Sequence, residues 1–192
     1  MPELILASTS VYRRELLTRL GLRFECVAPR IDETSLPTES PHDRAVRLAL
    51  AKAAAVAADR AGSVVIGSDQ VCVCKGESLE KPGDAARARA QLQWLSGAAA
   101  SFHTAVAVVQ SGPAHCLQFV DTTTVYFRAL GEKEIDRYIA VEKPFDCAGS
   151  FRCEGLGISL FTRVVSEDPT GLIGLPLIAV ARSLRQLGFE VP

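Results

Sequence analysis

Hydrophobic and polar positions along the chain predict strands that alternate with helices at both ends and pair as hairpins in the middle. Residues 4–7 form a short apolar run, and residues 12–20 follow with leucines at helical spacing before Gly21. Residues 64–66 are three β-branched residues in a row, a pattern typical of a strand buried on both faces. We therefore predict an α/β fold with a mixed rather than a purely parallel sheet.

The remaining elements follow from capping and turn signals. Ser40 and Pro41 begin a helix that runs through Asp59, and Asp84 caps a helix that ends near residue 95. Further strands are predicted at residues 23–28, 71–74, 102–109, 117–127 and 158–165, and further helices at residues 132–141 and 175–187. No internal repeat, low-complexity tract or linker interrupts them, so we predict one domain over residues 1–192.

The segment 64–70 is the starting point for any chemistry. Gly67 ends the apolar run, and Asp69 follows at the predicted carboxyl end of the strand. Ligands of α/β proteins bind at that edge of the sheet, so Asp69 is a candidate metal ligand or general base. On spacing alone, Asp69 as the cap of a turn fits the sequence equally well.

Composition narrows the class of protein without identifying it. The chain has 192 residues, 48% hydrophobic and 22% charged, which suffices for one sizeable core. A formal net charge of -1 gives no field that attracts nucleic acid or an anionic membrane, and no apolar run is long enough for a membrane span. The six cysteines and three histidines lack metal-binding spacing, so we expect reduced thiols in a cytoplasmic protein.

Residues 8–14 combine hydroxyl side chains and arginines at a predicted helix start. Ser8 and Ser10 precede the helix, and Arg13 and Arg14 follow in its first turn. Free N–H groups and the positive end of the helix dipole favour a phosphate there, and an arginine adds a charged fork. The alternative is a capped helix with two solvated arginines. Neither a Walker loop nor a dinucleotide-binding glycine motif is present.

Three further charged residues stand out by their context. Glu33 lies in a polar loop, Lys52 in an alanine-rich helix, and Lys81 directly before a proline. Each one alone is explained equally well as a solvated surface charge. Together with Asp69 and Arg13, they provide oxygen ligands for Mg²⁺ and cations for a polyphosphate. The set therefore predicts metal-assisted hydrolysis of a phosphoanhydride.

Short motifs are spread over nearly the whole chain, at residues 4–14 (LILASTSVYRR), 32–34 (DET), 66–70 (IGSDQ), 81–82 (KP), 148–151 (AGSF) and 174–177 (GLPL). Together they resemble the Maf family of nucleoside triphosphate pyrophosphatases, and the combination is far more specific than any one motif. The resemblance implies a Maf/Ham1 (ITPase-like) α/β fold, in which helices flank an elongated mixed sheet and two lobes surround a central cleft.

The same resemblance implies hydrolysis between the α- and β-phosphates of a nucleoside triphosphate, with Mg²⁺ or Mn²⁺ as the cofactor. Asp69 would accept a proton and, with Glu33, hold the metal. The implied phosphate-binding residues are Ser8, Ser10, Arg13, Arg14, Lys52 and Lys81. The implied partner is the small-molecule nucleotide rather than nucleic acid or membrane, and a homodimer is an expectation at the family level.

Three positions bear on the substrate within this family. Tyr12, Gln70 and Glu154 resemble the branch that acts on 7-methyl-GTP rather than the branch that acts on dTTP and UTP. A glutamate can accept hydrogen bonds from guanine N1–H and N2–H₂, and the cationic methylated base favours a carboxylate and an aromatic face. Without the resemblance, Glu154 is better explained as a solvated acid in a loop. The alternatives are a dTTP/UTP pyrophosphatase and a nucleotide-sensing regulator of cell division.

Overall fold

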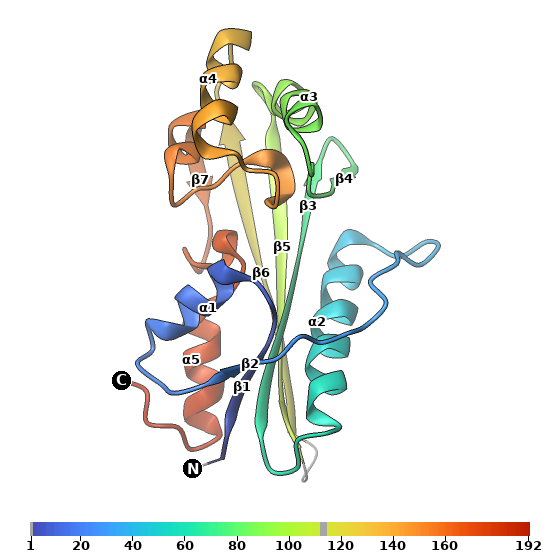
Figure 1. The fold of residues 1–192 in the computed structure, drawn as a ribbon, viewed down its shortest axis with the longest axis vertical. Helices are drawn as coiled ribbons and strands as arrows, with labels where there is room; N and C mark the ends of the chain where they lie inside the picture. The colour runs from blue at the N-terminus through green and yellow to red at the C-terminus, as the bar shows by residue number, and fades with distance from the viewer. Residues whose placement is uncertain (1, 112–114) are drawn as a thin grey trace. The chain divides into compact units, whose positions relative to one another are not determined.

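The computed structural model describes residues 2–111 and 115–192 and contains a seven-stranded mixed sheet with helices packed against it (Figure 1). The strand order is β2-β1-β3-β5-β6-β7, and β4 pairs with β3. The strands are β1 (Leu4–Ala7), β2 (Glu25–Cys26), β3 (Val64–Cys74), β4 (Glu77–Leu79), β5 (Ala99–Gln110), β6 (His115–Phe127) and β7 (Phe161–Val165). β1 runs parallel to β2 and β3, whereas β4 is antiparallel to β3 and β7 is antiparallel to β6. The predicted mixed sheet is confirmed.

The helices are α1 (Val11–Thr18), α2 (Pro41–Ala57), α3 (Ala85–Leu95), α4 (Glu132–Glu142) and α5 (Leu177–Gln186), with short 3₁₀ turns η1 (Ala148–Ser150), η2 (Leu156–Leu160) and η3 (Gly171–Ile173). The helices α2 and α3 begin where the capping signals predict, whereas α5 begins two residues later than predicted, at Leu177. The Ser40 side chain accepts a hydrogen bond from the Asp43 N–H, and the Asp84 side chain accepts one from the Arg87 N–H. Both caps satisfy N–H groups that the first helical turn leaves free. Among the described residues, no helix has the length and apolar character needed to cross a membrane.

The chain divides into two compact units, in agreement with the number of predicted lobes. Unit 1 consists of Met1–Gln70, His103–Asp121 and Asp168–Pro192, and unit 2 of Val71–Phe102 and Thr122–Glu167. Strands β3, β5 and β6 contribute residues to both units.

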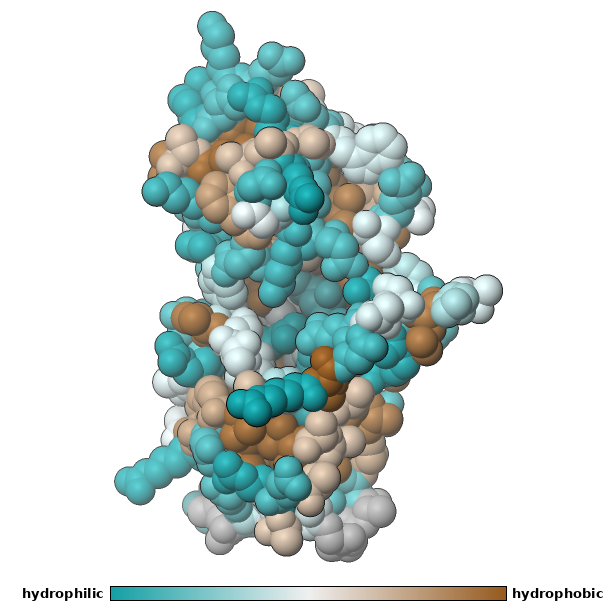
Figure 2. Space-filling view, turned by 45° about the vertical axis from the view of Figure 1, so that its right-hand side comes forward, coloured by the Kyte–Doolittle hydropathy of each residue, from teal (hydrophilic) through white to brown (hydrophobic). Residues whose placement is uncertain are grey.

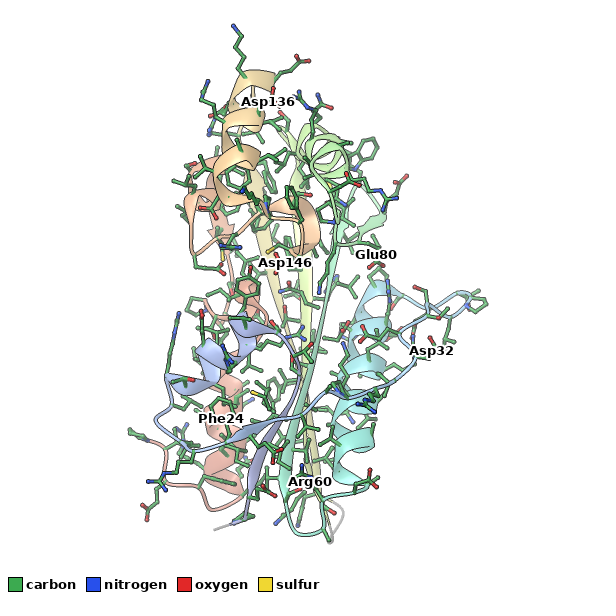
Figure 3. All side chains as sticks on the ribbon, in the orientation of Figure 1. Phe24, Asp32, Arg60, Glu80, Asp136 and Asp146 are labelled. Atoms are coloured by element: carbon green, nitrogen blue, oxygen red, sulfur yellow. The ribbon has the colours of Figure 1, made fainter. Side chains whose placement is uncertain are left out.

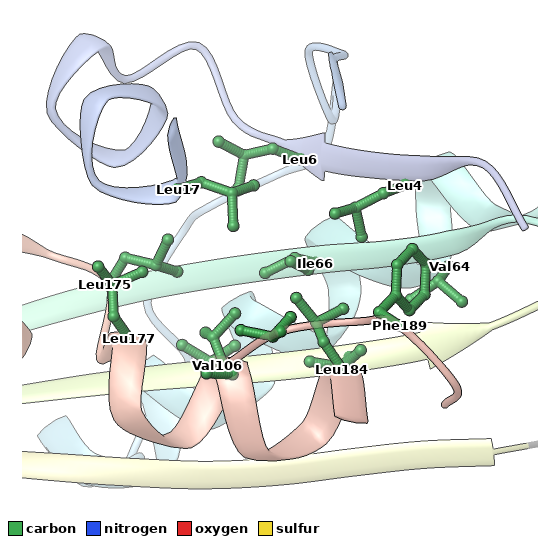
Figure 4. Close-up of a cluster of buried hydrophobic side chains, with 14 of the residues drawn as sticks. Leu4, Leu6, Leu17, Val64, Ile66, Val106, Leu175, Leu177, Leu184 and Phe189 are labelled. Atoms are coloured by element: carbon green, nitrogen blue, oxygen red, sulfur yellow. The ribbon is translucent and has the colours of Figure 1, made fainter. Parts of the chain in front are cut away.

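The core of unit 1 lies on the face of the sheet that α1 and α5 cover (Figure 4). Leu6 of β1 and Ile66 of β3 are fully buried there, together with Leu17 of α1 and Leu184 of α5. On the opposite face, α2 comes so close to β3 that a Cβ on Gly67 would lie 2.2 Å from the Ala49 carbonyl oxygen and 2.6 Å from the Ala53 nitrogen. Only glycine fits at this crossing, so helices cover both faces of the unit 1 sheet.

Unit 2 has a smaller core rich in aromatic side chains. The Phe151 ring makes edge-to-face contacts with Phe102, Phe127 and Phe161, with centroid separations of 5.3, 5.5 and 4.9 Å. Such pairs add to the stabilisation that burial alone provides. Hydrophobic side chains also reach the surface between polar ones (Figure 2), among them Val141 and Ile158 of this unit.

The structure corrects the predicted position of Asp69. β3 does not end at Gly67 but continues to Cys74, so Asp69 lies inside an 11-residue strand. It is β1 that ends here, because the parallel register stops at the pair Ala7 and Gly67. Asp69 therefore lies just beyond the carboxyl end of the parallel pair, the edge at which ligands of α/β proteins bind.

Two other strands are shorter than predicted. β2 comprises only Glu25–Cys26 of the expected 23–28, because its registered pairing is confined to Ile5 and Leu6 of the short β1. β7 begins at Phe161 rather than at residue 158, because the preceding residues form the turn η2.

Candidate active site

Three of the predicted residues form a charged cluster in unit 1. The Lys52 Nζ lies 2.6 Å from Asp69 Oδ1 and 3.1 Å from Glu33 Oε1. The side chains of Lys52 and Asp69 are only 7% and 10% exposed, whereas that of Glu33 is 54% exposed. One cation thus joins a buried carboxylate to a carboxylate that faces solvent.

The backbone of unit 1 fixes the distance between Lys52 and Asp69. Asp69 lies two residues after Gly67 and so projects from the same face of β3, the face that α2 covers. Lys52 belongs to the helical turn between Ala49 and Ala53, which are the residues in contact with Gly67. The close crossing of helix and strand therefore brings the two side chains together.

The segment that carries Glu33 is held by its neighbours. Asp32, labelled in Figure 3, accepts hydrogen bonds from the N–H and the hydroxyl of Thr34, at 2.9 and 2.6 Å. These two bonds hold the pKa of the Asp32 carboxyl below its ordinary value. Arg47 of α2 donates to the Thr34 carbonyl oxygen at 3.1 Å and also pairs with Glu39. The turn is thus tied to the helix that bears Lys52.

Arg13 of α1 belongs to the same electrostatic cluster. Its Nε donates a hydrogen bond to the Gly174 carbonyl oxygen at 3.0 Å. Burial lowers the pKa of Arg13, while the negative charges of Asp69 and Glu33 raise it in opposition. Because a guanidinium stays protonated in proteins, these carboxylates face a permanent positive charge.

The residues around the start of α1 behave in part as the helix-cap alternative predicts. Ser10 is the N-cap and accepts a hydrogen bond from the Arg13 N–H at 3.4 Å, and Ser8 accepts one from the Ser10 N–H at 3.1 Å. Tyr12 is half-buried. Arg14 is exposed and lines a shallow depression of about 590 Å³ with Arg23, Glu25 and Cys26, a lining that includes none of the charged cluster.

The opposite face of β3 carries a second polar group, in which the predicted residue Gln70 is joined by Ser68 and Thr104, which the sequence analysis did not single out. Ser68 donates its hydroxyl to the Gly174 carbonyl oxygen at 2.8 Å. The Gln70 amide nitrogen lies 2.8 Å from Thr104 Oγ1, 3.0 Å from the Gly171 carbonyl oxygen and 3.1 Å from the Leu172 carbonyl oxygen. The turn at residues 170–174 is therefore bonded to the strand that carries Asp69.

The carboxylates of Asp168 and Asp121 also contact the turn at residues 170–174. Asp168 accepts hydrogen bonds from the Thr170 N–H and hydroxyl at 3.0 and 2.6 Å, and from the Ile178 N–H in the first turn of α5 at 2.7 Å. Asp121 leaves no space at Gly171, where a Cβ would lie 2.3 Å from its Oδ2. The only signal for this turn in the sequence analysis was the motif at residues 174–177, and it did not indicate the role of these carboxylates.

Unit 2 carries the two remaining predicted residues, Lys81 and Glu154, both exposed. Glu154 lies in a loop whose backbone is braced by α4, since Glu142 Oε1 accepts the Leu156 N–H at 3.0 Å and the Tyr138 hydroxyl accepts the Arg152 N–H at 3.0 Å. The neighbouring thiol of Cys153 has a pKa raised to about 12 by burial and by the charge of Glu154.

The donor set fits a metal only with help from a substrate. Among residues 2–111 and 115–192, no group of three or more histidine, cysteine, aspartate or glutamate side chains is placed to hold an ion. Glu33 and Asp69 nevertheless already share one cation, the Lys52 ammonium, and two carboxylates are a usual protein contribution to a Mg²⁺ site completed by water and phosphate. All six cysteines are free thiols.

Comparison with known proteins gives a consistent family match. The profile of a family described as Maf-like protein matches residues 3–187. A 7-methyl-GTP pyrophosphatase from Xanthomonas axonopodis pv. citri (strain 306) is 57% identical over 192 residues, covering 100% of both chains. A 7-methyl-GTP pyrophosphatase from Ralstonia nicotianae (strain ATCC BAA-1114 / GMI1000) is 51% identical over 190 residues, covering 99% of this chain and 98% of the other. A solved HAM1 protein from Coxiella burnetii is 15% identical with a TM-score of 0.49, covering 97% and 98% of the two chains.

Proposed function

The chain belongs to the Maf family, and from this premise we propose that it is a nucleoside triphosphate pyrophosphatase that acts on 7-methyl-GTP. Water would cleave the bond between the α-phosphorus and the bridging oxygen to the β-phosphate, giving 7-methyl-GMP and pyrophosphate. The names of relatives at 51–57% identity over nearly full length support the substrate, and the site supports the reaction class.

The observation that carries the proposal is the gathering of Arg13, Glu33, Lys52 and Asp69 from four separate segments of unit 1. A sheet strand, two helices and a loop converge on one small set of alternating charges. A cluster with two carboxylates and two cations suits a polyanion and its attacking water better than it suits a hydrophobic core.

Each member of this cluster has a distinct task. Arg13 and Lys52 would neutralise charge on the triphosphate, and Asp69 would orient the attacking water and accept its proton. Glu33 and Asp69 would hold a divalent metal, Mg²⁺ or Mn²⁺, which supplies Lewis-acid polarisation of the phosphate oxygens. Lys52 then has to share Asp69 with that ion, a role that a mobile ammonium on a flexible stem can fill.

Two further assignments rest on the resemblance rather than on geometry. Lys81 remains a predicted phosphate ligand, with Ser8, Ser10 and Arg14. Tyr12 and Glu154 remain the predicted determinants of the base, because a carboxylate and an aromatic face both favour a cationic methylated guanine. We also propose a cytoplasmic protein that forms a homodimer and uses neither nucleic acid nor membrane as a partner.

The deciding experiment is pyrophosphate release by the purified protein across 7-methyl-GTP, GTP, dTTP and UTP, with Mg²⁺, Mn²⁺ or a chelator. We expect the highest kcat/KM for 7-methyl-GTP and loss of turnover with the chelator. Preference for dTTP or UTP would indicate the other branch of the family. Tight triphosphate binding without pyrophosphate release, metal present, would indicate a nucleotide sensor.

A further inference from the structure

Two hydrogen bonds converge on one backbone oxygen, on the face of β3 that α1 and α5 cover. The Gly174 carbonyl accepts from Arg13 Nε at 3.0 Å and from Ser68 Oγ at 2.8 Å. Ser68 is fully buried, so its hydroxyl is held in one position. The orientation of the Arg13 guanidinium therefore depends on where the Gly174 oxygen lies.

The position of that oxygen is fixed from several directions. Gly174 has φ +124°, a backbone conformation that side-chain-bearing residues rarely adopt, and a Cβ there would lie 3.4 Å from Arg13 Nε. Its N–H donates to the Gly171 carbonyl oxygen at 2.9 Å. The same Gly171 oxygen accepts from Thr104 Oγ1 at 2.9 Å and from the Gln70 amide at 3.0 Å. The strand thus holds both ends of the turn.

The side-chain amide nitrogen of Gln70 donates hydrogen bonds to this turn. A side-chain amide has two N–H donors, and the three oxygens within 3.1 Å of the Gln70 nitrogen already exceed that number. The Gln70 side chain therefore helps to hold the turn against the sheet.

We propose that the turn at residues 170–174 is a positioning element for Arg13, and that Ser68 acts on the reaction through it rather than by touching the nucleotide. This inference rests on the proposed function for the role of Arg13 at the triphosphate. Ser68 is then a positioning residue, and its influence should be the same whatever base the substrate carries.

A double-mutant cycle tests the link between Ser68 and Arg13. Arg13→Lys keeps the positive charge but lacks the Nε–H that reaches Gly174. We expect Ser68→Ala to lower kcat/KM for 7-methyl-GTP about tenfold in the wild-type background and less than about twofold in the Arg13→Lys background, since coupled residues are not additive. Equal losses in both backgrounds would overturn the proposal.

Ser63→Ala is the matched control. Ser63 is buried in unit 1 and donates its hydroxyl to a carbonyl oxygen, that of Arg60, at 2.7 Å. Ser63→Ala removes a similar hydrogen bond but leaves the contacts of the turn intact, so kcat/KM should stay within about twofold of wild type. A loss as large as that of Ser68→Ala would mean that the Ser68 effect is general destabilisation, which overturns the proposal.

A comparison of two substrates separates positioning from base recognition. We expect Ser68→Ala to lower kcat/KM by the same factor for 7-methyl-GTP and for UTP, leaving their ratio unchanged. A change of that ratio beyond about fivefold would overturn the positioning role of Ser68. A near-UV circular dichroism spectrum of each variant confirms that only folded protein is compared.

Failure of the proposed function can be distinguished from failure of this inference. If the wild-type protein releases no pyrophosphate from 7-methyl-GTP, the proposed function fails. The link between Ser68 and Arg13 is then measured in urea unfolding of the same four proteins, where coupling at the shared oxygen supports the positioning turn and additivity overturns it.

Discussion

Two carboxylates of nearly equal burial, one in each unit, have different bonding partners. The Asp69 side chain is 10% exposed and the Glu142 side chain 12%. Asp69 has an ammonium at 2.6 Å, supplied by a side chain. Glu142 accepts a backbone N–H, that of Leu156, at 3.0 Å, and its nearest guanidinium nitrogen, on Arg152, is 3.8 Å away.

The difference shows that burial alone does not identify a reactive acid. A carboxylate bound to backbone holds a loop in place, and its charge is incidental to that task. A carboxylate paired with a mobile side chain can exchange its partner for substrate or metal. The identity of the partner, more than the degree of burial, separates the candidate base in unit 1 from the brace in unit 2.

Exchanging each carboxylate for its amide gives the largest expected contrast. Asp69→Asn should lower kcat for 7-methyl-GTP by roughly 10²- to 10⁴-fold, the usual contribution of a general base, while the protein stays folded. Glu142→Gln retains an oxygen acceptor for the Leu156 N–H and should keep activity within about threefold of wild type. Pyrophosphate release measures both, and normal turnover by Asp69→Asn would refute its assigned role.

Removing the cation of unit 1 tests how far the pair depends on charge. Lys52→Met leaves the buried Asp69 carboxylate without its ammonium and should lower the free energy of unfolding by about 3 kcal/mol. The double variant Lys52→Met/Asp69→Asn, which has no buried charge at this position, should recover part of that loss. Urea unfolding followed by circular dichroism gives both values. No recovery in the double variant would mean that lost packing, rather than an unpaired charge, dominates.

Removing the brace of unit 2 should have a smaller and more local effect. Glu142→Ala takes away the acceptor of the Leu156 N–H, which we expect to cost about 1 kcal/mol because this part of the loop is exposed to water. The loop at residues 152–157 should open more often, and hydrogen exchange at the Leu156 amide should accelerate. Unchanged exchange in Glu142→Ala would show that Tyr138 and the aromatic core hold the loop without Glu142.

The smallest expected effect concerns the partly buried imidazole of His103. Burial, with a contribution from His42, lowers the pKa of His103. The unfolded chain therefore binds a proton more readily than the folded one, so stability declines as the pH falls below about 6.5. His103→Gln should flatten the difference in unfolding free energy between pH 7.5 and pH 5.5. An unchanged pH dependence in the variant would assign it to other groups.

Helix starts and hairpin turns were predictable because their causes are local. Ser40 and Asp84 each cap the helix that follows, by accepting a hydrogen bond from the N–H three residues later in the chain. The two-residue turn between β3 and β4 places Lys75 and Gly76 at positive φ, as a two-residue hairpin turn requires. The charged cluster was predictable for a different reason, since a lysine among alanines and an acid inside an apolar run stand out in any sequence.

The turn network was not predictable from one sequence. Ser68 and Gly174 are 106 residues apart, and Gln70 and Gly171 are 101 apart, so no local pattern relates them. The misplaced end of β3 has the same origin. Gly67 resembles a strand terminator until the contact with Ala49 and Ala53 is known, and that contact depends on how α2 packs. Long-range packing, rather than propensity, decides such positions.

Because Gly67 has no side chain, the backbones of α2 and β3 come into direct contact at this position. With the two backbones touching, the gap that Lys52 must bridge to reach Asp69 is set by main-chain geometry rather than by rotamer choice. One methyl group at this position would wedge the helix outward and lengthen the ion pair without altering either charged residue. The distance between the charges of Lys52 and Asp69 thus depends on Gly67, a residue that carries no charge and has no side chain with which to contact a nucleotide.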